Sequence, residues 1–161
     1  MRVIYPGSFD PITYGHLDII TRCSEKFDEV IIAVLNNNKK NSLFSVEERI
    51  ELLEKATKHL PNVETDSFSG LLIDYASEKG CSTIVRGLRV VSDLEYEMQM
   101  ALVNKKLYPD LETLFLVSSS EFSFLSSSLV REVAAFKGDV GCFVPKDVEI
   151  ALKEKFKGGS K

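Results

Sequence analysis

Residues 30–35, Val-Ile-Ile-Ala-Val-Leu, decide the fold, because they form an unbroken apolar run. A strand that is covered on both faces carries such a run, whereas a strand with one face in water alternates apolar and polar residues. Residues 16–26, shortly before it, place apolar side chains at the spacing of one helix face. Together the two segments favour a parallel sheet with helices packed against it.

The rest of the chain continues this alternation. We expect strands at residues 2–5, 30–35, 63–67, 83–85 and 113–117, and helices at 16–26, 45–58, 71–79, 93–107, 126–136 and 146–156. Ser45 with Glu48 three residues later is typical of a capping box at a helix start. The pattern predicts the α/β class and a single-domain Rossmann-like fold, a five-stranded parallel sheet with helices on both faces. The domain is expected to cover residues 1–157, followed by a disordered tail at 158–161.

Composition and charge exclude several classes of partner. The net charge of −4 argues against a basic surface for nucleic acids. No apolar run approaches the length of a membrane span, and the N-terminus lacks the pattern of a signal peptide. Cys23, Cys81 and Cys142 are too far apart for a disulfide framework or a zinc site with paired ligands. We therefore expect a cytoplasmic protein that binds neither nucleic acid nor membrane.

Hydroxyls, cations and a histidine follow the expected strands at their carboxyl ends, which meet at one edge of a parallel sheet and bind ligands there. They are Ser8 and His16 after the first strand, Lys40 after the second, Arg86 and Arg89 after the fourth, and serine-rich residues 118–128 after the fifth. Such a set fits a polyanionic ligand. Neither the dinucleotide fingerprint nor the P-loop motif is present, which disfavours a dinucleotide oxidoreductase and a P-loop NTPase.

Five motifs in order along the chain resemble one known family. Residues 13–16, Thr-Tyr-Gly-His, are similar to the T/H-x-G-H signature of the nucleotidyltransferase superfamily. With residues 5–11, 86–89, 95–97 and 126–128, the chain resembles the bacterial phosphopantetheine adenylyltransferases, and the similarity spans residues 2–152. The resemblance implies transfer of the adenylyl group of ATP to 4′-phosphopantetheine, giving dephospho-coenzyme A and pyrophosphate. It also implies Mg²⁺ held mainly through the ATP phosphates, no metal ligand from the protein, and a homohexamer.

The attacking phosphate in this reaction is already an anion, so no general base is needed. The protein then supplies positioning and charge neutralisation. By resemblance, His16 stabilises the pentavalent transition state, and Lys40 and Arg89 are further catalytic residues. The residues implied for ATP binding are Ser8, Phe9, His16, Gly87, Leu88, Arg89, Glu97, Phe122, Ser123, Phe124, Leu125, Ser126, Ser127 and Ser128. Those implied for phosphopantetheine binding are Ser8, Lys40, Leu72 and Arg86.

Two other functions remain open at this point. A nucleotidyltransferase of the same superfamily with another phosphorylated acceptor would differ at Lys40, Leu72 and Arg86. A nucleotide-binding sensor would bind ATP and release no pyrophosphate, but it would not need a clamp for an acceptor phosphate. Without the resemblance, Asp93 and Glu97 would be taken as part of a solvated helix face.

Overall fold

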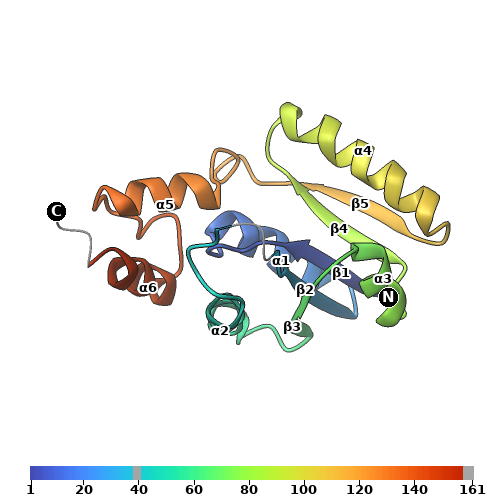
Figure 1. The fold of residues 1–161 in the computed structure, drawn as a ribbon, viewed down its shortest axis with the longest axis horizontal. Coiled ribbons are helices and arrows are strands. Elements are labelled where there is room, and N and C mark those ends of the chain that lie inside the picture. The colour runs from blue at the N-terminus through green and yellow to red at the C-terminus, as the bar shows by residue number, and fades with distance from the viewer. Residues whose placement is uncertain (38–40, 158–161) are drawn as a thin grey trace.

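One parallel sheet organises the protein, whose computed structural model describes residues 1–37 and 41–157 (Figure 1). In these residues five strands pair in the order β3-β2-β1-β4-β5, and every pairing is parallel. The strands are β1 (Arg2–Gly7), β2 (Glu29–Leu35), β3 (Val63–Phe68), β4 (Thr83–Leu88) and β5 (Glu112–Val117). The helices are α1 (Tyr14–Lys26), α2 (Val46–Thr57), α3 (Leu72–Glu78), α4 (Val91–Leu107), α5 (Ser127–Ala135) and α6 (Lys146–Phe156). The predicted fold class is confirmed.

The core lies on the two faces of this sheet, because successive side chains of a strand point to opposite faces. Val3 of β1 packs in a cluster with Ile19 of α1 and Leu53 of α2, which α5 and α6 extend. Ile4 packs on the other face with Ala76 of α3. Figure 1 shows α4 running along β4 and β5 at one end of the molecule, with α5 and α6 at the other. No helix within the described ranges is long and apolar enough to cross a bilayer.

The helix ends follow the expected local chemistry. Ser45 and Glu48 form the capping box, with the Glu48 amide 3.2 Å from Ser45 Oγ and the Ser45 amide 2.8 Å from Glu48 Oε2. Gly80 takes a φ of 60° just beyond α3, a left-handed conformation that glycine adopts at little cost. These helix ends could be predicted from the sequence, because the residues that form them are neighbours in the chain.

β1 and β4 are longer than the sequence indicates. Arg86 and Gly87 were expected in the loop after the fourth strand, but they lie within β4 and pair with Phe115 and Leu116 of β5. A strand can contain Arg86 at this depth because its guanidinium has a carboxylate partner, Glu97.

The ligand site follows from the strand order. β1 lies between β2 and β4. The chain passes from β1 to β2 on one side, and after β3 it returns to β4 on the other side of β1, so the direction of the connections reverses between β1 and β4. The carboxyl ends of β1 and β4 therefore flank the switch point, where open α/β sheets bind ligands. This end of the sheet holds the cavities described next.

Candidate active site

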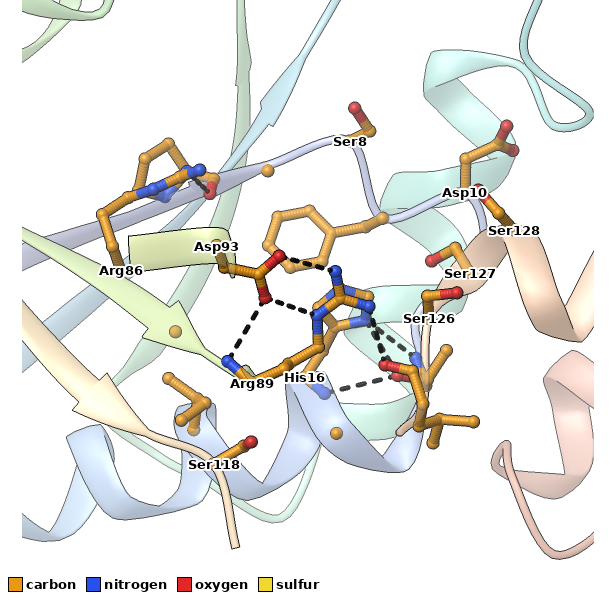
Figure 2. Close-up of a pocket in the computed structure, with 18 of the residues that line it drawn as sticks. Ser8, Asp10, His16, Arg86, Arg89, Asp93, Ser118, Ser126, Ser127 and Ser128 are labelled. Atoms are coloured by element: carbon orange, nitrogen blue, oxygen red, sulfur yellow. Dashed lines mark hydrogen bonds and ion pairs between the residues drawn. The ribbon is translucent and has the colours of Figure 1, made fainter. Parts of the chain in front are cut away.

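Two cavities open at the carboxyl ends of β1 and β4, and they share a wall. The first has a volume of about 310 Å³ and reaches from β1 to the start of α5 (Figure 2). The second, about 340 Å³, lies between β4, the start of α3 and α4. The residues that line both are Pro6, Gly7, Ser8, Arg86 and Glu97. A ligand in one cavity can therefore meet a ligand in the other at Ser8 and Arg86.

His16 is fixed on the first cavity by the N-cap of α1. The backbone amide of Thr13 donates to His16 Nδ1 at 3.1 Å, and Thr13 Oγ1 accepts from the His16 amide at 3.4 Å. The ring packs edge-on against Phe9, with centroids 5.1 Å apart. Because Nδ1 accepts the hydrogen bond from the Thr13 amide, the neutral ring carries its hydrogen on Nε2. His16 thus presents a single N–H donor to the cavity.

The imidazole of His16 stays neutral at pH 7. Burial and, to a smaller extent, the positive charge of Arg89 together lower the pKa of His16 to about 4. An uncharged donor can stabilise negative charge that develops on a phosphate without a proton leaving or joining the ring.

This pKa predicts how acid unfolds the protein. An unfolded histidine has a pKa near 6.5, so between about pH 6.5 and 4 the unfolded chain binds the proton and the folded chain does not. The contribution of neutral His16 to the free energy of unfolding is therefore fully present above about pH 6.5, and it is lost as the pH falls toward 4. We expect His16→Ala to lose stability less steeply across this window than the wild type, as measured by urea unfolding at several pH values. Equal slopes would contradict a partly buried His16 that stays neutral in the folded protein.

The loop after β1 is held in place by an aromatic contact and by a buried arginine. Phe9 has a φ of 48°, and its ring fills the space beside Gly7, where a Cβ would lie 3.0 Å from the ring. Gly7 is therefore needed for this aromatic contact. Arg49, which is buried, donates to the carbonyl of Ser8 at 2.8 Å and to that of Leu35 at 3.2 Å. Ser8 is thereby fixed at the shared wall.

Arg89 reaches across the first cavity toward the serine-rich loop. Its Nε lies 3.2 Å from Asp93 Oδ2, and one Nη donates to the carbonyl of Leu125 at 3.2 Å. The guanidinium is partly exposed and has further N–H groups to offer an anion. Figure 2 shows this side chain directed across His16, so both donors serve the same part of the cavity.

The start of α5 forms the opposite wall. Ser126 caps the helix by accepting from the Leu129 amide at 3.1 Å, and Ser127 Oγ donates to the carbonyl of Pro11 at 2.7 Å. One turn later, Arg131 donates to the carbonyl of Asp10, whose carboxylate accepts from the amides of residues 43 and 44 at 2.9 Å. Helix N-termini with a nearby arginine attract phosphate groups. This wall suits the end of a triphosphate.

Arg86 is bound more firmly than the other cations. Glu97 accepts from Arg86 Nε at 2.7 Å and from Nη2 at 2.6 Å, while Nη1 donates to the carbonyl of Pro6 at 2.9 Å. Burial alone lowers the pKa of Arg86, but the hydrogen bond and charge of Glu97 outweigh it, so the net pKa is raised. Glu97, predicted beside the nucleotide, lines the first cavity, and its carboxylate is bonded to Arg86.

The structure brings most of the predicted residues together. The first cavity is lined by Ser8, Phe9, His16, Arg86, Gly87, Arg89, Glu97, Leu125, Ser126, Ser127 and Ser128. Leu72 lines the second cavity, as expected of a residue next to the acceptor. Leu88, Phe122, Ser123 and Phe124 line neither cavity, and Phe124 instead packs edge-on against Phe143. Lys40 lies outside the described residues.

Sequence reasoning missed several residues that line the first cavity. They are Tyr5, Asp10, Asp93 and Arg131. Arg131 had a readable signal, since it stands four residues after Ser127 and so shares its helix face. Asp93 stands four residues before Glu97 and shares a face with it in the same way. Tyr5 carried no local signal that distinguishes it from a core residue.

The comparison with known families agrees with this geometry. A family model described as cytidylyltransferase-like matches residues 4–133. The chain belongs to the cytidylyltransferase-like family. This membership makes it a nucleotidyltransferase, with a nucleotide as one substrate. A solved structure of a Vibrio parahaemolyticus protein assigned as a nicotinate-nucleotide adenylyltransferase shares the fold, with a TM-score of 0.72, 17% sequence identity, and coverage of 99% of this chain and 96% of that one.

Proposed function

We propose that this nucleotidyltransferase transfers the adenylyl group of ATP to 4′-phosphopantetheine, giving dephospho-coenzyme A and pyrophosphate. The observation that carries the proposal is the pair of cavities with a common wall. The first offers His16, Arg89 and the start of α5 to a triphosphate. The second extends from Arg86 along apolar side chains, which suits an acceptor with one phosphate and a long, uncharged arm. The side chains of that second surface are Phe68, Leu71, Leu72, Tyr96 and Met100.

In this reaction the acceptor phosphate lies at Ser8 and Arg86 on the shared wall. One of its oxygens attacks the α-phosphorus of ATP, a new P–O bond forms, and the bond from the α-phosphorus to the bridging oxygen breaks. The electron pair leaves with pyrophosphate, so no proton has to be removed from the nucleophile. His16 Nε2–H and the Arg89 guanidinium stabilise the charge that develops on the α-phosphate and the leaving group.

Magnesium is proposed to enter with the nucleotide. No group of three histidine, cysteine or acidic side chains in the described ranges could hold a metal ion. The acidic side chains on the first cavity have other partners, since Asp93 pairs with Arg89 and Asp10 accepts from backbone amides. These residues fit an ion that keeps its waters and binds phosphate oxygens. When bound, Mg²⁺ would neutralise part of the triphosphate charge.

A second acceptor is worth testing because the fold is shared with a protein assigned to nicotinate nucleotide. A mononucleotide acceptor would place a planar ring and a ribose in the second cavity. Away from the shared wall its lining among the described residues is mainly apolar, with polar side chains only on Tyr96, Asn104 and Thr113, so we favour the phosphopantetheine arm.

The deciding experiment is product analysis of the purified protein with ATP and Mg²⁺. We expect dephospho-coenzyme A and pyrophosphate with 4′-phosphopantetheine, identified by mass spectrometry, and little pyrophosphate with nicotinate mononucleotide. Turnover only with the mononucleotide would contradict the proposed acceptor. ATP binding with no turnover on any acceptor would favour a sensor.

We also propose that the protein assembles into a hexamer. Six large apolar side chains of α4 are at least 39% exposed, which is unusual for one helix of a monomer. They are Tyr96, Met98, Met100, Leu102, Val103 and Leu107. We expect light scattering to give six times the mass of the chain at more than one protein concentration. A mass equal to one chain throughout would contradict the proposal.

A further inference from the structure

The hydroxyl of Ser118, at the carboxyl end of β5, is buried without a hydrogen-bond partner among the described residues. Ser118 is only 8% exposed, and its backbone is satisfied, since the amide donates to the carbonyl of Leu88 at 2.8 Å. Buried side-chain hydroxyls are nearly always paired, and each exception needs a reason. A ligand that supplies the missing partner is such a reason, because Ser118 lines the first cavity.

Ser118 stands apart from the groups that suit phosphate. Figure 2 shows it across Arg89 and His16 from Ser126, Ser127 and Ser128. The charged neighbours of this segment are already engaged, because Arg22 donates to the carbonyl of Val117 at 2.8 Å and pairs with Asp18. A triphosphate that occupies the cationic wall therefore leaves this end of the cavity to another part of the nucleotide.

The surroundings of Ser118 suit a flat group with a polar edge. Gly87 borders the same cavity, and a Cβ there would lie 3.4 Å from Ile19 Cγ1 and 3.5 Å from Tyr5 Oη. The absence of a side chain at Gly87 thus keeps a narrow space open beside an apolar side chain. A nucleotide base fills such a space with its ring and offers nitrogen atoms at its edge that a serine hydroxyl can donate to or accept from.

We propose that Ser118 Oγ hydrogen-bonds the edge of the base of the bound nucleotide and so helps the enzyme to prefer ATP. This inference rests on the proposed function, in which ATP occupies the first cavity. Ser118 makes no contribution to the transferred phosphate, so it is a specificity residue. Its hydroxyl has no partner among the described residues and gains one when the nucleotide binds.

The neighbouring residue provides a matched control. Ser119 Oγ is likewise buried without a partner in the part of the chain that the structure describes, and its amide donates to Asp18 Oδ2 at 3.2 Å. Ser119 does not line the first cavity. Ser118→Ala and Ser119→Ala therefore remove the same group from adjacent positions, and only the first removes it from the ligand's surroundings.

The test is calorimetric binding of ATP, 2′-deoxyATP and CTP to the full chain without acceptor. We expect Ser118→Ala to bind ATP and 2′-deoxyATP each roughly three- to tenfold more weakly, the factor that one hydrogen bond is worth. CTP, whose base has a different edge, should lose less, so the preference for ATP over CTP falls. Ser119→Ala should bind all three nucleotides as the wild type does. Both variants should melt at or above the wild-type temperature, because neither loses a hydrogen bond.

Several results would overturn the inference. Wild-type affinity for ATP in Ser118→Ala would do so, as would an equal loss in Ser119→Ala. If Ser118→Ala binds ATP more weakly but binds 2′-deoxyATP as the wild type does, the contact lies on the ribose hydroxyl, which contradicts a contact with the base. These results differ from failure of the proposed function, in which the wild type binds ATP with its base preference but forms no dephospho-coenzyme A.

Discussion

Replacing His16 with alanine is expected to lower the turnover number for nucleotidyl transfer by roughly a hundredfold to a thousandfold, the usual effect of removing one aligned donor to a developing charge. The ring is held by the Thr13 amide on Nδ1 and by an edge-to-face contact with Phe9, so its Nε2–H is aligned before substrate binds. Steady-state kinetics with ATP and acceptor measure the effect. The Michaelis constant for ATP should change much less, because the contact strengthens in the transition state.

Two further variants make this result specific. His59→Ala removes the other histidine, which is exposed, and should leave turnover unchanged. His16→Gln keeps a neutral N–H donor near the position of Nε2 and should retain more activity than His16→Ala. If glutamine and alanine are equally inactive, a neutral donor is insufficient and the charged form of His16 takes part after all. If His16→Ala turns over normally, His16 has no catalytic role.

Local signals made much of the fold predictable. The apolar run at 30–35 is β2, buried on both faces, and the capping box at Ser45 starts α2 as expected. The site was predictable to the extent that the carboxyl ends of parallel strands meet at one edge. That rule placed His16, Arg89 and residues 126–128 on one cavity without knowledge of any distance.

The rest depended on contacts between distant residues. Whether Arg86 ends β4 or lies within it is decided by pairing with β5 and by Glu97, eleven residues later. The need for glycine at position 7 comes from the ring of Phe9, which a turn rule does not contain. Ser118 reads as one of several serines in a loop, and what distinguishes it is a buried hydroxyl without a partner among the described residues together with its place on the first cavity.

Replacing Glu97 with alanine should give the second large effect, on both stability and acceptor binding. The Arg86–Glu97 pair is bidentate, with side chains 30% and 13% exposed, so the variant leaves a mostly buried guanidinium without its carboxylate. Breaking a fully buried pair costs about 3–5 kcal/mol, and partial exposure of Arg86 reduces this to about 2 kcal/mol. Urea unfolding measures the loss. Glu95→Ala, an exposed position on the same helix, is the matched control and should unfold as the wild type does.

The kinetics of Glu97→Ala distinguish its two possible roles. Through Arg86, Glu97 would position the acceptor phosphate at the shared wall, so its loss should raise the Michaelis constant for 4′-phosphopantetheine about tenfold and leave that for ATP nearly unchanged. Glu97→Gln keeps the shape and one acceptor oxygen for Arg86 Nη2, so it should recover part of the loss. A direct contact with the nucleotide predicts the opposite pattern, a raised constant for ATP at a normal constant for the acceptor. That outcome would restore Glu97 to the nucleotide site and leave Arg86 to bind the acceptor phosphate without help from it.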